Sequence, residues 1–237
     1  AEGLALTNIV ALGDLPIESP RRERLAFAHF VRGMSRRLLA VRGGTTSAPQ
    51  LRMAREHLLT AAAIFDEFPI FGGSNRDAAQ AATCRCAARE VDVLLGYVSP
   101  NEMVEEVIAS LDLHRDLAST TSSIAESLGW RCIFAARVIL AGVKRFPEPE
   151  RLLAILTNKA DEVAERLGHW ALREQIFTLE HLHRVLSVDT GEEPPAWNLD
   201  EDDVRILMGT MGRFPRFRTI GWRILREVRR EREEESA

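Results

Sequence analysis

The residue pattern most suggestive of chemistry is Glu180-His181-Leu182-His183, which lies in a segment with helical periodicity. Its Glu-x-x-His spacing places a carboxylate and an imidazole on one face of a helix, as in bundles that hold two iron ions. Such a site requires a second copy of the motif and two further glutamates, and the sequence has no second copy. His181 and His183 point about 200° apart on a helix and cannot chelate one ion together. We therefore predict an exposed polar helix face here and no metal site.

The three cysteines, Cys84, Cys86 and Cys132, do not have the number or spacing of a zinc site or a disulfide framework. We interpret them as small core residues. A sparse and odd set of cysteines is typical of a reducing compartment, so we expect a cytoplasmic location. The chain begins at Ala1 without a Met, which leaves open a targeting segment upstream.

The familiar catalytic motifs are missing from the sequence. It contains no phosphate-binding loop of the Walker type, no Gly-x-Ser-x-Gly elbow and no His-Glu-x-x-His. We predict no catalytic residues and no cofactor. A helical enzyme or a small-ligand-binding bundle, with a site assembled from distant residues, is kept as a second alternative.

Arginines interleaved with aromatic residues dominate the C-terminal region. Candidate nucleic-acid-binding residues there are Arg213, Arg216, Arg218, Arg226 and Arg229, beside Phe214, Phe217 and Trp222. Such side chains can contact phosphates and stack on bases. The favoured interpretation is a last helix packed through its apolar residues with solvated arginines, whose charge the glutamates at 231 and 233–235 partly neutralise.

A protein partner is the first choice for what the chain binds. Trp197 lies in a Pro-Pro-Ala-Trp stretch and is predicted to be exposed, which suits a partner anchor. We add Trp222 and Arg223 to it as candidate partner-binding residues. Trp130 and Trp170 are expected to pack at the edge of the core. The oligomeric state is left open.

The elements that carry these residues are predicted to be helices throughout. Ala, Leu, Arg and Glu are abundant, there is a single Tyr, and alternating runs are few. No uncharged run approaches the roughly 20 residues that span a bilayer, so no membrane partner is expected. Ser99-Pro100-Asn101-Glu102 is the clearest helix start, a capping box with Pro at the first helical position. The first strong helix, after Ser19-Pro20, has an apolar stripe of Phe27, Val31, Met34, Leu38 and Val41.

Two similar phrases, 124–130 and 163–169, begin 39 residues apart. Each is predicted to end one helix at a glycine, Gly129 or Gly168, and to start the next, as the bend of a helical hairpin. Repeated hairpins that bury one face against the next are the pattern of α-solenoids. A bundle of helical hairpins is the alternative arrangement.

The phrases Ala125-Glu126-x-Leu128-Gly129 and Ala164-Glu165-x-Leu167-Gly168 resemble tetratricopeptide-type repeats. The resemblance covers roughly residues 48–187, with a looser copy at 62–68. It implies an all-α scaffold whose concave face binds a peptide, a partner helix or a small ligand, and it carries no fixed binding residues.

The predicted organisation is a helical-hairpin repeat domain over 1–187, a Pro-rich linker over 188–199 and a C-terminal basic helical segment over 200–237. The predicted function is a non-enzymatic adaptor that recognises a protein partner. A nucleic-acid-associated regulatory protein is the first alternative.

Overall fold

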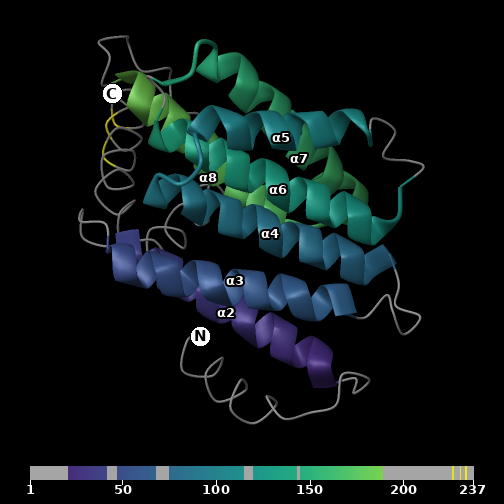
Figure 1. Cartoon of the computed structure of the whole chain (residues 1–237). Coiled ribbons are helices and arrows are strands. Elements are labelled where there is room, and N and C mark those ends of the chain that lie inside the picture. The colour runs from purple at the N-terminus through teal and green to yellow at the C-terminus, as the bar shows by residue number, and fades with distance from the viewer. Residues whose placement is uncertain are drawn as a thin grey trace.

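The computed structural model describes residues 21–41, 47–67, 75–114, 120–142 and 145–188, together with Arg226, Arg230 and Glu233; of 181–188 it describes the backbone alone. These residues form an all-α structure, which confirms the predicted fold class (Figure 1). The helices are α2 (Arg21–Val41), α3 (Ala48–Glu67), α4 (Asn75–Leu95), α5 (Pro100–Asp112), α6 (Ser122–Ala141), α7 (Pro149–Leu167) and α8 (Trp170–Val188).

Local sequence signals explain where several helices begin and end. The backbone N–H of Glu102 donates to Ser99 Oγ over 3.1 Å and Pro100 follows the cap, so α5 starts where the capping pattern predicts. Glu102 does not complete the reciprocal half of the box, because its carboxylate pairs with Arg89 instead. Thr121 caps α6 in the same way as Ser99 caps α5.

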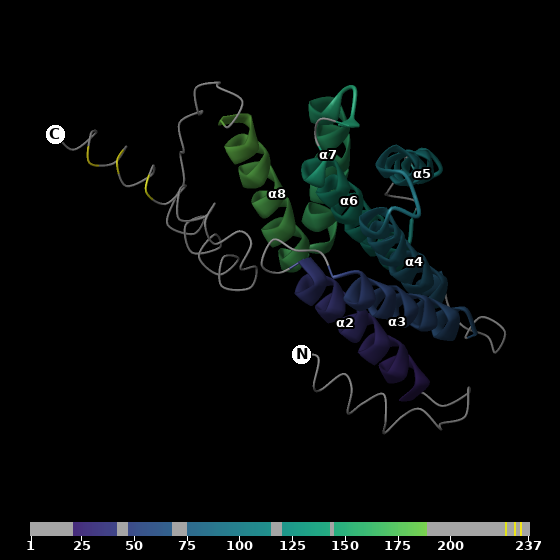
Figure 2. The same ribbon diagram turned by 60° about the vertical axis from the view of Figure 1, so that its left-hand side comes forward.

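Neighbouring helices pack in chain order. Helix α2 packs on α3, α3 on α4, α4 on α6, and α6 on both α7 and α8. Helix α5 lies outside this series against α4 and α6. Figures 1 and 2 show α2 and α3 side by side at one end of the stack, and Figure 2 shows α7 and α8 together away from them. The arrangement is compatible with a helical repeat.

The predicted bend at Gly129 is wrong, whereas the bend at Gly168 is confirmed. Helix α6 runs without interruption through Gly129. A Cβ atom there would lie 2.8 Å from Leu172 Cδ1 and 3.1 Å from Val163 Cγ1, so the glycine allows α7 and α8 to approach α6 closely. Gly168 has a φ of 59° and ends α7 in the left-handed conformation that glycine favours.

The buried face of α2 also differs from the predicted apolar stripe. Val31 and Leu38 are 38% and 37% exposed, respectively. The buried face instead carries mainly small residues and one cation: Leu25, Ala26, Ala28, Arg32, Gly33 and Ala40. A Cβ at Gly33 would lie 2.7 Å from Leu58 Cγ, so close packing of α2 on α3 selects small side chains over bulky ones.

The remaining core follows the predicted periodicity. In α3 the buried positions include Leu51, Ala54, Leu58 and Phe65, as the helical spacing predicts. All three cysteines are buried and free, which confirms them as core residues. Burial raises the pKa of each thiol to about 12. The prediction that Trp170 packs at the edge of the core is wrong, because its side chain is 59% exposed.

Within the described part of the chain, no helix combines the length and the apolar character needed to cross a membrane. The predicted linker over 188–199 and the C-terminal segment over 200–237 lie almost entirely outside the described residues.

Candidate functional site

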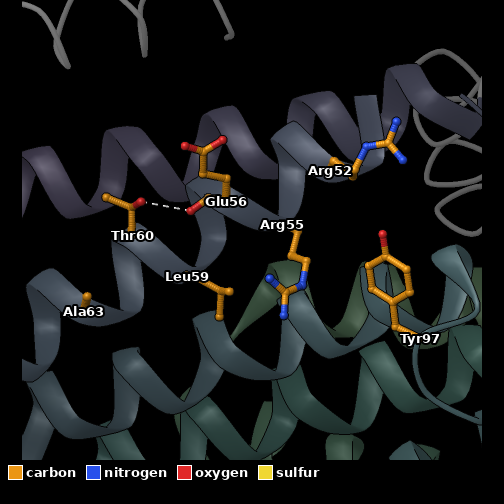
Figure 3. Close-up of a pocket in the computed structure, with 7 residues that line it drawn as sticks. All are labelled: Arg52, Arg55, Glu56, Leu59, Thr60, Ala63 and Tyr97. Atoms are coloured by element: carbon orange, nitrogen blue, oxygen red, sulfur yellow. Dashed lines mark hydrogen bonds between the residues drawn. The ribbon is translucent and has the colours of Figure 1, made fainter. Parts of the chain in front are cut away.

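An open pocket of about 530 Å³ lies along one face of α3 (Figure 3). Seven residues line it: Arg52, Arg55, Glu56, Leu59, Thr60 and Ala63 from α3, and Tyr97 from the turn after α4. The α3 residues recur every three or four positions, so helical geometry alone places them on a single face. In Figure 3 the two arginines and Tyr97 occupy one end of the pocket, and Thr60 and Ala63 the other.

The turn that ends α4 brings Tyr97 to this face. Gly96 has a φ of 75°, in the left-handed region. The N–H of Gly96 donates to the carbonyl of Val93 over 3.1 Å, and the N–H of Tyr97 donates to the carbonyl of Asp92 over 2.9 Å. These two bonds form a Schellman motif, which reverses the chain at the helix end. Tyr97 is left 60% exposed at the edge of the pocket.

Of the charged side chains that line the pocket, only Arg55 forms an ion pair with another described residue. Arg55 Nε donates to Asp92 Oδ1 over 2.5 Å, so the buried Asp92 carboxylate neutralises this guanidinium. Thr60 Oγ1 donates to the Glu56 carbonyl over 2.9 Å. Neither Arg52 nor the Glu56 carboxylate forms an ion pair with any residue of the described ranges. As far as the described residues go, the pocket therefore offers one cation and one anion without an ion pair, and an aromatic ring, around Leu59 and Ala63.

A second group of charges joins four helices in the interior. The Arg37 guanidinium of α2 pairs with the Glu90 carboxylate of α4, whose side chain is 2% exposed. Arg137 of α6 donates to Gln175 Oε1 of α8 over 2.5 Å and lies 5.6 Å from the centroid of the Phe134 ring. Burial lowers the pKa of Arg137 to about 10, although the nearby Glu90 carboxylate acts in the opposite direction. We call Arg37, Glu90, Arg137 and Gln175 the charge cluster.

The charge cluster ties helices together rather than presenting a reactive group. Its one carboxylate lies between two guanidinium groups, one of them hydrogen-bonded to it and the other attracted to it. This carboxylate is also shut off from solvent, because the Glu90 side chain is only 2% exposed. The pocket on α3, by contrast, is open, and its Arg52 and Glu56 form no ion pair within the described ranges, so it is the better candidate for binding.

Most of the site residues predicted from the sequence lie outside the described residues. These are Trp197, Trp222, Arg223, Arg213, Arg216, Arg218 and Arg229. Arg226 is described, and it is helical and exposed. His181 and His183 belong to α8 by their backbone, and the described side chains of that helix stop at Glu180. Among the described side chains, no group of three or more His, Cys, Asp or Glu is placed to hold a metal ion.

Sequence reasoning missed the residues of the pocket. The signal that could have found part of it is the polar face of α3, where Arg52, Arg55 and Glu56 lie within two turns. The role of Tyr97 has no such signal, because its position beside α3 depends on how α4 packs. No model of a known protein family, no curated protein and no solved structure matches this chain.

Proposed function

We propose that this chain is a binding module of stacked helical hairpins that recognises a short segment of a protein partner in the pocket on α3. The observation that carries the proposal is the combination of an unneutralised Arg52, an exposed Tyr97 and apolar surface in one open pocket. Arginine and tyrosine are enriched among the residues that dominate protein–protein binding energy. The three free, buried thiols fit the cytoplasmic location that we propose for it.

The charges of the pocket indicate which segment it accepts. Arg52 suits a carboxylate of the partner, because a guanidinium binds a carboxylate through two parallel hydrogen bonds. Leu59 and Ala63 suit an aliphatic side chain of the partner. Glu56 suits a backbone N–H or a lysine. We therefore propose an acidic and aliphatic segment as the ligand.

The proposal keeps the resemblance to tetratricopeptide-type domains as an inference about architecture. Those domains present peptide-binding surfaces on stacked helical pairs, and the stack of α2 to α8 supports the same use here. The proposed binding position is the pocket formed by α3 and the turn at Gly96.

A display library of peptides selected on the full chain tests this proposal. We expect enriched peptides to share an acidic residue and a nearby aliphatic residue. Their affinity, measured by calorimetry, should fall about tenfold or more in Arg52→Glu, because a charge-assisted hydrogen bond contributes about 1.5–3 kcal/mol. Arg24→Glu is the matched control, since Arg24 is also an exposed helical arginine.

Two results would contradict the proposal. One is equal binding of the selected peptides to the chain with Glu at position 52. The other is equal loss of binding in the Arg24 variant, which would mean that only the net charge of the chain matters.

A further inference from the structure

The solvent-facing side of α3 carries one continuous stripe of side chains. We call it the α3 stripe, and it consists of Arg52, Glu56, Leu59, Ala63 and Asp66. These residues follow one another at intervals of four, three, four and three positions, which is the spacing of a helix face that packs along another helix. Leu59 is partly buried and the other four are exposed. The stripe extends over about 21 Å, at about 1.5 Å per residue, so it offers a second helix a long contact.

The charges of the α3 stripe are arranged symmetrically about its apolar centre. Leu59 lies seven positions after Arg52 and seven positions before Asp66, so a cation and an anion lie at equal distances on either side. An antiparallel copy of the helix, related by a two-fold axis at Leu59, brings Asp66 of one copy opposite Arg52 of the other at both ends. A parallel copy would bring like charges together, Arg52 against Arg52 and Asp66 against Asp66. The stripe is therefore complementary to itself in the antiparallel direction.

Both charged ends of the stripe can bind a second partner. Arg52 lines the open pocket and forms no ion pair with any residue of the described ranges. Asp66 Oδ2 accepts from Arg85 Nη1 over 2.5 Å, and both side chains of this pair are about half exposed, at 49% and 48%. An ionised carboxylate accepts several hydrogen bonds, and an exposed ion pair contributes little to stability. Asp66 can therefore accept from the Arg52 guanidinium of a second copy without the loss of a buried contact.

The middle of the stripe allows two helices to approach closely. Leu59 supplies apolar surface at the centre, and the neighbouring Thr60 and Ala63 have small side chains. In the antiparallel arrangement, Glu56 would lie beside Ala63 of the other copy, whose small side chain leaves the carboxylate in contact with water. The pairing therefore buries apolar surface at its centre and leaves no carboxylate cut off from solvent.

We propose that the α3 stripe pairs antiparallel with the α3 stripe of a second copy of this chain. The inference rests on the proposed function, because it names the molecule that supplies the acidic and aliphatic segment, namely Leu59, Ala63 and Asp66 of the second α3. Tyr97 lies at the Arg52 end of the pocket, where the end of that helix would contact it (Figure 3). One pair of helices is a small interface, so the dimer is weak and reversible. Each copy covers the pocket of the other, which makes the pocket accessible to other ligands in the monomer alone.

Sedimentation velocity of the full chain over a range of concentrations tests the pairing. We expect a monomer–dimer equilibrium. Arg52→Asp and Asp66→Arg should each raise the dissociation constant of the dimer about tenfold or more, because each change replaces attraction by repulsion at both ends of the interface. Arg24→Asp is the matched control, since Arg24 is an exposed arginine of α2, and it should leave the dissociation constant unchanged.

A mixture of the two variants distinguishes paired stripes from a general effect of charge. In the mixed dimer, the aspartate introduced at position 52 meets the arginine introduced at position 66, and the original Arg52 and Asp66 meet at the other end. Equal amounts of the variants should therefore form a heterodimer with about the original dissociation constant, although neither variant pairs with itself. Thermal unfolding followed by circular dichroism verifies that both variants keep the fold, as expected for exposed substitutions.

Two results would overturn the pairing: an original chain that stays monomeric at millimolar concentration, or a mixture of the variants that stays monomeric. Asp66→Arg separates the pairing from the proposed function, because Asp66 does not line the pocket. This variant should bind the peptides selected by display as the original chain does. Peptide binding by a chain that never dimerises would remove the pairing and leave the proposed function in place. A dimer without any selected peptide would mean that the chain itself is the ligand of the pocket.

Discussion

Glu90 is the single carboxylate on which the charge cluster depends. Its Oε1 accepts from Arg37, its Oε2 has no hydrogen-bond partner, and its charge also acts on Arg137. Removing a buried carboxylate leaves a buried guanidinium without compensation, and loss of one partner from such a pair costs about 3–5 kcal/mol. Glu90→Ala should therefore lower the free energy of unfolding by about that amount in urea denaturation.

Glu162→Ala is the matched control for Glu90→Ala. Glu162 pairs with Lys159 over 2.8 Å, but its side chain is 53% exposed. Exposed ion pairs contribute about 0–1 kcal/mol, so this variant should unfold at nearly the original urea concentration. A loss in Glu90→Ala no larger than that in Glu162→Ala would show that the charge cluster does not hold the four helices together.

At the scale of helices, two glycines test how closely neighbouring elements approach. A Cβ at Gly33 would lie 2.7 Å from Leu58 Cγ and 3.0 Å from the Ala54 carbonyl oxygen. A Cβ at Gly129 would meet Leu172 Cδ1 at 2.8 Å, which is the end of a side chain. The branch carbon and the backbone at Gly33 are harder to displace, so relief of the clash there requires a helix to move.

Gly33→Ala should therefore destabilise the chain more than Gly129→Ala. Both substitutions gain about 1 kcal/mol of helix propensity, which cancels in the comparison. Overpacking costs about 1–3 kcal/mol, and we expect Gly33→Ala to be the less stable by about 1–2 kcal/mol in urea denaturation. Equal stabilities would mean that α2 can shift on α3 as easily as Leu172 changes its rotamer.

The sequence predicted the elements that depend on local chemistry. Ser99 starts α5 and Gly168 ends α7 because an N-cap hydroxyl and a left-handed glycine act on their own turn of the chain. The same reasoning failed at Gly129, because that glycine makes room for Leu172 and Val163 of neighbouring helices. A glycine that ends a helix and one that admits a neighbouring helix look alike in sequence.

Burial of polar residues was beyond prediction for the same reason. Helical periodicity predicts the buried face of a helix from its hydrophobic residues, so a charged residue is predicted to be exposed. Arg32 and Glu90 are nevertheless buried. Tyr97 reaches the pocket only through the Gly96 turn and the packing of α4 on α3. These positions are set by tertiary contacts, and one of them, Tyr97, is a residue to which the proposed function assigns binding.

At the scale of the whole molecule, net charge bears on whether the chain binds a protein or a nucleic acid. It carries 31 lysines and arginines against 35 aspartates and glutamates, a net charge of −4. Its overall field therefore repels a polyanion, and only a local concentration of arginines could overcome that repulsion. Among the few described residues of this region, Arg226 and Arg230 are exposed and lie one helical turn apart.

We therefore expect no measurable binding of a mixed-sequence duplex or single strand at about 150 mM salt, where counterion release adds least to affinity. Fluorescence anisotropy across a salt series measures this directly. On duplex DNA, a plot of the logarithm of the binding constant against the logarithm of the salt concentration has a slope of about −0.9 per phosphate contact. Binding through such contacts therefore becomes measurable as the salt concentration is lowered. Affinity that falls steeply with salt, and that is lost when Arg223, Arg226 and Arg229 are replaced by alanine, would contradict the expectation. That result would make the C-terminal arginines, rather than the pocket on α3, the principal binding surface of the chain.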